Sequence, residues 1–118
     1  MRDSAAEPTV FVDGENVRRS RWPNLTKEQL LERTRAWAEA EGVEPVVVFD
    51  GGAPPGAIGT GSESADDWLI REVPQRAPYW LVTSDRALRD EAGAAAERVI
   101  GGGAFLELLD EFEASQER

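Results

Sequence analysis

The sequence predicts a three-layer α/β domain built on a parallel sheet of about four strands, and three observations favour this fold class. Two segments, TVFV (9–12) and VVVF (46–49), are apolar or β-branched throughout, as strands buried on both faces are. A helical pattern separates them. The same alternation then continues toward the C-terminus. We therefore expect a single domain over residues 1–118, with a core at about 9–112.

The segment between the two strands carries the signals of a helix. Thr26, followed three residues later by Gln29, is typical of a capping box at a helix N-terminus. An apolar stripe follows, and Gly42 ends the helix. The stripe consists of Leu30, Leu31, Thr34, Trp37 and Ala38. Strand, helix and strand in this order predict two parallel strands with a right-handed crossover.

The second half of the chain continues the pattern after a loop rich in Gly and Pro. The expected elements are a loop at 51–62, a helix at about 65–73, a strand at 79–83, a helix at about 86–94, a strand at 98–100 and a last helix carrying Phe105, Leu108, Leu109 and Phe112. The strand order that fits is 2-1-3-4. In this order the winding reverses between the first and third strands, and doubly wound folds bind ligands at such a point.

Composition limits the chemistry of any metal site. The chain has no His and no Cys, which removes the ligands that zinc, copper and iron–sulfur sites prefer. A metal here must accept oxygen ligands, which favours Mg²⁺ or Mn²⁺. The formal net charge of −10 argues against a protein that coats nucleic acid generally, but it does not exclude a nuclease.

Acidic residues follow three of the predicted strands. Asp13 and Asp50 come directly after the first two strands, and Asp85 closely follows the third. The carboxyl ends of parallel strands open onto the ligand crevice, so these side chains are candidate metal ligands. Other interpretations stay open, because Asp13 fits an Asx turn and Asp85 fits a helix N-cap. Ser84 competes for that cap, which would leave Asp85 free to bind a ligand.

Three further polar residues belong to the candidate site. Asp66 lies on the apolar side of its helix, where a carboxylate is costly unless it is paired or metal-bound. Asp67 is either a ligand or part of a capping box with Ser64. Asn16 follows Gly14 after the first strand and is placed to orient a water or a phosphate.

Basic and aromatic residues near the first strand are candidates for contacts with nucleic acid. Arg18, Arg19 and Arg21 lie shortly after Asp13 in the sequence, and Arg86 begins a later helix. Arginine suits phosphate oxygens because its planar fork donates two hydrogen bonds. Trp22 would stack on a base. A solvated basic face with Trp22 folded onto it is the alternative.

Four motifs in order resemble a known family. VFVDGEN, VVVFDGG, ESADDWL and LVTSDRAL, followed by GGGAFLELL, are similar to the PIN-like nuclease superfamily, most closely to its NYN branch of the YacP-like ribonuclease type. VFDGGAPPG also resembles the equivalent strand end of the flap endonucleases, which are distant members. The similarity spans roughly residues 9–112. Glu15 stands where the family's VDGYN motif has an aromatic residue.

The resemblance implies a PIN-like, Rossmannoid domain that hydrolyses RNA as a metal-dependent endoribonuclease. The implied metal-binding carboxylates are Asp13, Asp66 and Asp85, supported by Asn16, Asp50 and Asp67. Our hypothesis is that one or two Mg²⁺ or Mn²⁺ ions activate a water for in-line attack on a phosphodiester. The expected partners are RNA, including structured or ribosome-associated RNA, and a protein partner or a second copy of the chain.

Two other functional classes are alternatives to a nuclease. A non-catalytic NYN-like module that binds RNA or protein is favoured by the net charge. A phosphoryl-transfer domain is disfavoured, because VDGEN lacks an Asp-x-Asp pair and no lysine follows the third or fourth strand. No apolar run is long enough to span a membrane, and the first ten residues lack the apolar segment of a signal peptide, so we expect a cytoplasmic protein.

Overall fold

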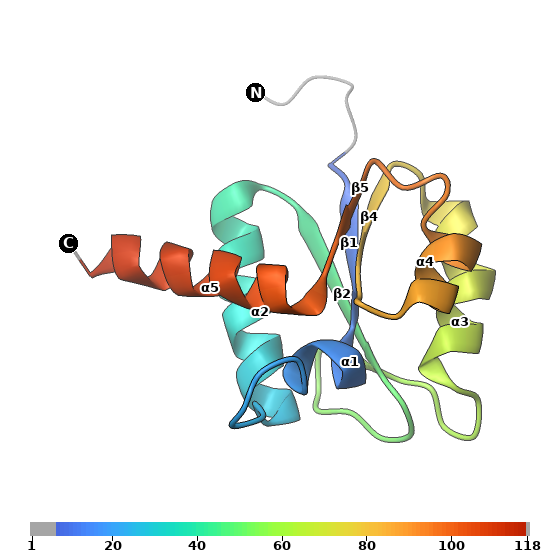
Figure 1. The fold of residues 1–118 in the computed structure, drawn as a ribbon, viewed down its shortest axis with the longest axis horizontal. Helices are drawn as coiled ribbons and strands as arrows, with labels where there is room; N and C mark the ends of the chain where they lie inside the picture. Colours follow the sequence, from blue (N-terminus) through green and yellow to red (C-terminus); the bar gives the residue numbers. More distant parts are fainter. Residues whose placement is uncertain (1–6, 118) are drawn as a thin grey trace.

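The computed structural model describes residues 7–117, and its centre is a parallel sheet of five strands in the order β3-β2-β1-β4-β5 (Figure 1). The strands are β1 (Thr9–Asp13), β2 (Glu44–Phe49), β3 (Ile58–Gly59), β4 (Tyr79–Val82) and β5 (Arg98–Ile100). The helices are α1 (Gly14–Arg18), α2 (Lys27–Glu41), α3 (Ala65–Glu72), the 3₁₀ helix η1 (Val73–Arg76), α4 (Arg86–Ala92) and α5 (Gly102–Gln116).

The predicted fold class is confirmed, and the four expected strands lie in the expected order. The strand count is corrected by β3, which pairs in parallel with the end of β2 inside the segment expected to be only a loop. Two residues in a Gly- and Pro-rich stretch carry no strand pattern, so β3 could not be recognised. Helix α1 was also missed. It starts at once after β1 because Gly14 packs closely: a Cβ there would lie 2.5 Å from the Phe49 ring.

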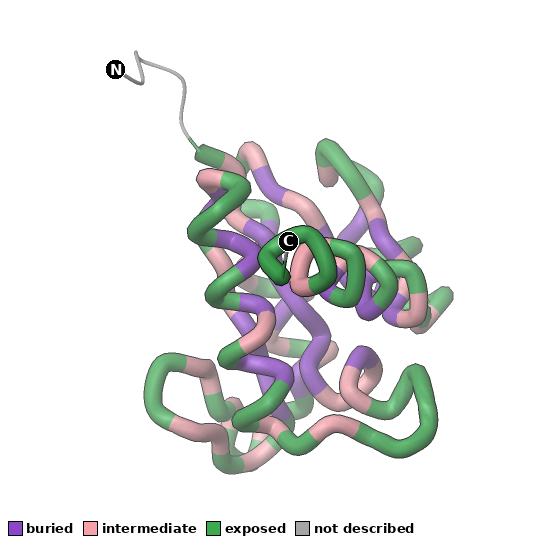
Figure 2. Tube along the Cα trace, turned by 90° about the vertical axis from the view of Figure 1, so that its left-hand side faces the viewer, coloured by how far each residue is buried: buried purple, intermediate pink, exposed green. Residues whose placement is uncertain are grey.

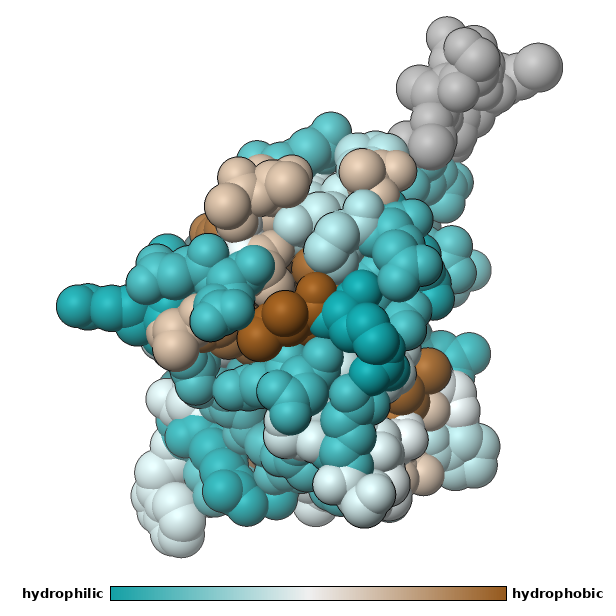
Figure 3. All heavy atoms as spheres, turned by 90° about the vertical axis from the view of Figure 1, so that its right-hand side faces the viewer, coloured by the Kyte–Doolittle hydropathy of each residue, from teal (hydrophilic) through white to brown (hydrophobic). Residues whose placement is uncertain are grey.

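Helices cover both faces of the sheet. Figure 1 shows α2 and α5 on one face and α3 and α4 on the other. The alternating residues of β1 divide between the two cores, with Val10 and Val12 packed on the α2 and α5 side and Phe11 on the α3 and α4 side. Figure 2 shows the buried strands behind α2 and α5. The opposite face, in Figure 3, is mostly hydrophilic with a small hydrophobic area.

Helix α2 begins and ends as its sequence predicts. The Thr26 hydroxyl accepts a hydrogen bond from the Gln29 N–H, and the Gln29 side chain accepts one from the Thr26 N–H. Gly42 ends the helix in the left-handed conformation, with φ of 73°. Thr34 faces the core, and its buried hydroxyl has no hydrogen-bond partner within residues 7–117. That hydroxyl lowers the stability of the helix packing.

An ion-pair network joins α2 to α5. Arg33 contacts Glu113 at 2.5 Å and Asp110 at 2.8 Å. Arg21, from the segment before α2, contacts Asp110 at 2.9 Å. These residues lie on the surface, and we refer to Arg21, Arg33, Asp110 and Glu113 as the α2–α5 ion network.

The segment between β2 and α3 folds back on itself. Gly51 and Gly61 form an antiparallel bridge, and the Thr60 N–H donates to the Phe49 carbonyl at 3.1 Å. At Gly59 a Cβ would lie 2.6 Å from the Gly51 carbonyl oxygen, so only glycine permits this approach. Backbone hydrogen bonds therefore hold both ends of a segment that the sequence predicts as a simple loop.

The helices can be compared with membrane-spanning helices in length and composition. Within residues 7–117, no helix combines the length and the apolar character that crossing a bilayer requires.

Candidate active site at the carboxyl ends of the strands

Asp13 is the buried centre of the site. It ends β1, its exposed fraction is 4%, and its Oδ2 accepts a hydrogen bond of 2.8 Å from the Thr83 hydroxyl. Burial raises the pKa of Asp13 to about 6, and the negative charges of Asp66, Asp85 and Asp50 add to this rise, while the Thr83 hydrogen bond opposes it. Three acidic residues that follow strands and Asp66 on α3 thus lie in one electrostatic neighbourhood.

Thr83 connects two of the acidic residues. Its hydroxyl donates to Asp13 and accepts from the Asp85 N–H at 3.1 Å, and the residue is fully buried. One side chain therefore fixes both the Asp13 carboxylate and the backbone that leads into α4. Thr83 is not among the predicted site residues. The available signal was a hydroxyl directly after an apolar strand and two residues before an aspartate.

Asp85 caps α4. Its Oδ1 accepts the Leu88 N–H at 3.0 Å, which is the geometry of an N-cap. Ser84, the competing candidate for this cap, does not take it: the Ser84 hydroxyl accepts the Gly102 N–H at the start of α5, at 2.8 Å. The Oδ2 atom of Asp85 has no hydrogen bond within residues 7–117, so one oxygen remains available to a ligand.

Asp50 positions the helix that carries Asp66. The Asp50 Oδ1 accepts the Ala65 N–H at 2.6 Å and so anchors the first turn of α3 beside the end of β2. Asp66 is half-buried in that turn, and its pKa is raised by burial first and then by the charges of Asp85, Asp50 and Asp67. Asp50 is therefore part of the wall of the site.

Asp67 points away from the buried part of α3. Ser64 is the N-cap of this helix, and its hydroxyl accepts the Asp67 N–H at 3.0 Å. The Asp67 residue itself is exposed. Its charge acts on Asp66, but its location fits the helix start better than the centre of the site.

The four acidic residues share an electrostatic field without forming a tight cluster. Within residues 7–117, no three acidic side chains lie close enough together to hold one metal ion. The metal-ligand role of Asp13, Asp66 and Asp85 therefore stays a prediction.

Asn16, on α1, is hydrogen-bonded to the segment that follows β4. Its Oδ1 accepts the Ser84 N–H at 2.8 Å, which leaves the side-chain amide group free to donate. Asn16 also lines an open pocket of about 500 Å³. The lining residues are Glu15, Asn16, Arg19, Ser20, Ser84 and Gly103. At Gly102 a Cβ would lie 2.2 Å from the Ser20 hydroxyl, so α5 begins very close to this wall.

The predicted substrate-binding residues fall into two groups. Arg18 and Arg21 are engaged in the protein, Arg18 with Glu15 and Arg21 with Asp110. Arg19 and Arg86 are exposed, although Arg19 also contacts Glu15 at 3.3 Å, and Trp22 is 85% exposed. The alternative in which Trp22 folds onto the surface is wrong, because so exposed an indole covers little of the protein.

The fold and its acidic edge define a doubly wound α/β domain with carboxylates at the carboxyl ends of its strands. No family model matches the sequence, and no curated protein matches it significantly. Among solved structures, it is similar to a mutant of Rae1 (YacP) from Bacillus subtilis, with a TM-score of 0.79 and 20% sequence identity, over 94% of this chain and 80% of that one. The chain therefore has a YacP-like fold, as its motifs predict.

Proposed function

We propose that this protein is a metal-dependent endoribonuclease that hydrolyses RNA phosphodiester bonds at the carboxyl ends of β1 and β4. The observation that carries the proposal is Asp13, a buried carboxylate that lies in the field of three other acidic residues and, within residues 7–117, takes a side-chain hydrogen bond only from Thr83. Such an arrangement is costly, and perturbed carboxylates of this kind gather at functional sites. A cation would relieve the cost.

The donor atoms fit a hard divalent cation. Every candidate ligand is an oxygen, as Mg²⁺ and Mn²⁺ prefer. Mg²⁺ is usually held by one or two carboxylates, with water and substrate phosphate completing its shell, so three carboxylates around one ion are not required. Asp13, Asp66 and Asp85 would hold it, with Asp50 and Asp67 nearby. When bound, the cation supplies positive charge that activates water and stabilises the leaving oxygen.

The chain's own residues orient the reacting groups. Thr83 fixes Asp13 and the backbone of Asp85, and Asp50 fixes the turn that carries Asp66. The free amide of Asn16 donates toward the open pocket, where it would orient a substrate phosphate. Since the chain has no histidine, a carboxylate is the side chain suited to accept the proton of the attacking water.

Exposed groups around the site would bind the RNA. Arg19 and Arg86 are candidates for backbone phosphates. The exposed Trp22 indole would stack on an unpaired base, a contact worth about 1–3 kcal/mol per base. RNA, including structured or ribosome-associated RNA, is the substrate class that these groups fit.

The test is cleavage of a panel of labelled RNAs with Mn²⁺, with Mg²⁺ and with EDTA, in the original protein and in Asp13→Asn. We expect cleavage with either metal, none with EDTA, and a loss of about 10²- to 10³-fold in the variant, the usual effect of removing one charge-stabilising group. A circular RNA distinguishes endonucleolytic cleavage, because it has no ends. Cleavage that survives both EDTA and the substitution would contradict the proposal.

A second candidate function is a non-catalytic module that binds RNA or a protein partner. Two observations favour it: no three acidic side chains within residues 7–117 are close enough to share a metal ion, and the net charge is −10. RNA binding in EDTA without cleavage under any metal condition would select this function over the nuclease.

A further inference from the structure

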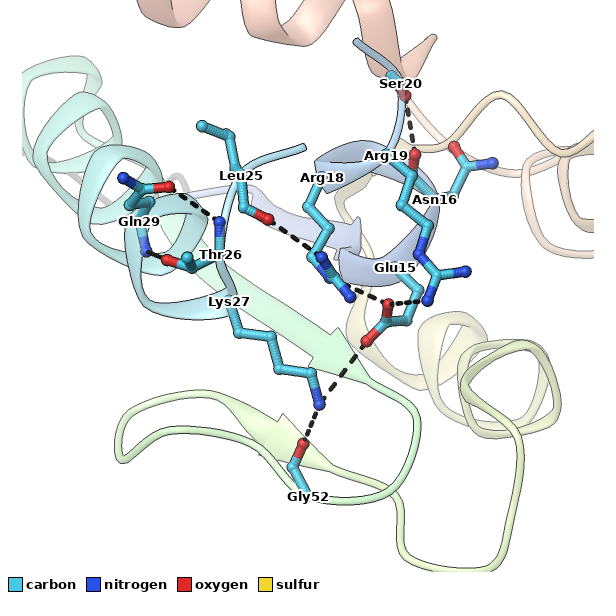
Figure 4. A network of polar contacts seen from close by, with 10 residues as sticks. All are labelled: Glu15, Asn16, Arg18, Arg19, Ser20, Leu25, Thr26, Lys27, Gln29 and Gly52. Carbon is cyan, nitrogen blue, oxygen red and sulfur yellow. Dashed lines mark hydrogen bonds and ion pairs between the residues drawn. The ribbon is translucent and has the colours of Figure 1, made fainter. Parts of the chain in front are cut away.

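Glu15 is surrounded by three cations (Figure 4). Its Oε1 lies 3.0 Å from Arg18 Nε and 3.3 Å from Arg19 Nη2, and its Oε2 lies 3.7 Å from Lys27 Nζ. The Glu15 side chain is 17% exposed. A single carboxylate therefore faces an excess of positive charge in a partly buried setting.

Two of these cations are anchored independently of Glu15. Arg18 Nη1 donates to the Leu25 carbonyl at 3.1 Å, and Lys27 Nζ donates to the Gly52 carbonyl at 2.7 Å. Lys27 also lies 5.4 Å from the centre of the Phe49 ring. Their positive groups would thus stay in place if the Glu15 carboxylate moved away. Protein contacts have already fixed them, which lowers the entropic cost of binding another anion.

The third cation connects this cluster to solvent. The Arg19 side chain is 62% exposed, and both Arg19 and Glu15 line the open pocket that also contains Asn16. Glu15 follows Asp13 by two residues, so the cluster lies at the same edge of the sheet as the acidic site. A ligand bound at that site would have the cations within reach of its neighbouring phosphates.

We propose that the Glu15 carboxylate occupies a phosphate subsite, and that a phosphodiester of single-stranded RNA replaces it against Arg18, Arg19 and Lys27. A carboxylate and a phosphodiester both present two charged oxygens to guanidinium and ammonium donors. Single-stranded RNA fits because the Trp22 indole, three residues after Arg19 in the chain, is exposed and free to stack on an unpaired base. Glu15 is then an internal competitor that weakens RNA binding. This inference rests on the proposed RNA substrate.

A purely structural role for Glu15 makes the opposite prediction. In that role the carboxylate fastens α1 to the start of α2, as the contacts with Lys27 allow. Neutralising it would lower stability and leave RNA affinity unchanged. Glu15→Gln separates the two roles because glutamine keeps the shape and one acceptor oxygen while it removes the charge.

The experiment measures binding of a fluorescent single-stranded RNA in EDTA, over a series of salt concentrations, for the original protein, Glu15→Gln and Glu44→Gln. Glu44 is an exposed residue that begins β2 at the opposite edge of the sheet, and its substitution removes the same charge. We expect Glu15→Gln to bind about fivefold more tightly than Glu44→Gln, the upper range for an exposed ion pair. Its salt dependence should steepen by about 0.7 in the log–log slope, as one further phosphate contact predicts.

A double variant locates the effect. If the gain arises at this cluster, Glu15→Gln combined with Arg19→Gln should lose most of it. The inference is overturned if Glu15→Gln binds RNA no more tightly than Glu44→Gln. This includes the case in which neither variant binds RNA. The proposed nuclease activity fails separately: tighter RNA binding by Glu15→Gln, with no metal-dependent cleavage by any protein in the set, would refute the nuclease and leave this subsite standing.

Discussion

The acidic site and the α2–α5 ion network contain the same chemical group in opposite situations. In the network, hydrogen bonds from Arg21 and Arg33 hold the pKa of Asp110 below its usual value. At the site, burial and neighbouring carboxylates raise the pKa of Asp13 to about 6. Ionised Asp110 therefore stabilises the fold, while ionised Asp13 destabilises it. The comparison teaches that this fold tolerates an electrostatic cost at the site that it avoids elsewhere.

The two effects also differ in size. The Asp110 side chain is 48% exposed, so water and salt screen its ion pairs, and surface pairs contribute about 0–1 kcal/mol. Asp13 is 4% exposed and has little screening. A rise of its pKa from 3.8 to about 6 corresponds to roughly 3 kcal/mol. Sites of function commonly retain such a cost because activity requires it.

The largest expected effect follows from Asp13→Asn. Because the folded-state pKa is raised above 3.8, wild-type Asp13 costs little at a pH well below 3.8, and its cost grows as the pH rises toward 6. The variant should therefore be about as stable as the original protein at about pH 3 and exceed its unfolding free energy by roughly 3 kcal/mol at pH 7. Urea unfolding at several pH values measures this.

Asp90→Asn is the control for that series, because Asp90 is an exposed carboxylate on α4 and its removal should change stability little at any pH. If Asp13→Asn were no more stable than the original protein at pH 7, the comparison between the two regions would break down.

Metal binding should give the next largest effect. If Mn²⁺ binds the native state at the acidic site, it should raise the unfolding free energy by about 2.7 kcal/mol at a concentration of 100 Kd. Asp66→Ala should lose this gain, whereas Asp110→Asn should keep it, since Asp110 belongs to the network. Thermal denaturation with and without Mn²⁺ makes the measurement, and an equal gain in both variants would place the metal elsewhere.

A third prediction concerns Thr34, which lies outside the acidic site. It tests whether a buried hydroxyl without a hydrogen-bond partner lowers the stability of the fold. Thr34→Val removes a buried hydroxyl without a partner and keeps the shape, so it should stabilise the protein by about 1 kcal/mol. Thr26→Val is the matched control on the same helix, and it should destabilise by about 1 kcal/mol because it removes the N-cap. Chemical denaturation should show opposite signs, and a loss of stability in both would contradict the expectation.

The smallest effect is expected in the ion network. Asp110→Asn should lower the unfolding free energy at pH 7 by about 0.5 kcal/mol. Because the pKa of Asp110 is lowered in the fold, this contribution should disappear as the pH falls through that value. High salt should also reduce it. An effect as large as that of Asp13→Asn would mean that exposure does not separate the two regions.

Local sequence signals predicted most of the fold. The apolar runs gave β1 and β2, and the capping pair Thr26 and Gln29 with Gly42 gave both ends of α2. The small elements escaped for physical reasons. Helix α1 depends on the approach of Gly14 to Phe49, and β3 depends on pairing with the end of β2. Both are tertiary contacts that a short stretch of sequence does not encode.

The sequence predicted where the acidic residues lie in the fold better than it predicted their contacts. The strand ends identified Asp13, Asp50 and Asp85, but Asp50 anchors α3 and Asp85 caps α4, roles that depend on where each helix starts. Arg21 was a predicted RNA-binding residue, but in the fold it donates to Asp110, which is 89 residues away in the chain. Side-chain partners at such separations follow from the packing of α5 and from no local pattern.

The folded-back segment between β2 and α3 has a thermodynamic consequence. Its bridge between Gly51 and Gly61 and its link to Lys27 through Gly52 are contacts within the protein itself. If RNA binds at the proposed site, this segment is already folded beside it, so association should not include the folding of this segment. The heat-capacity change on binding should then reflect only the surface that RNA covers, without the large negative contribution that coupled folding adds.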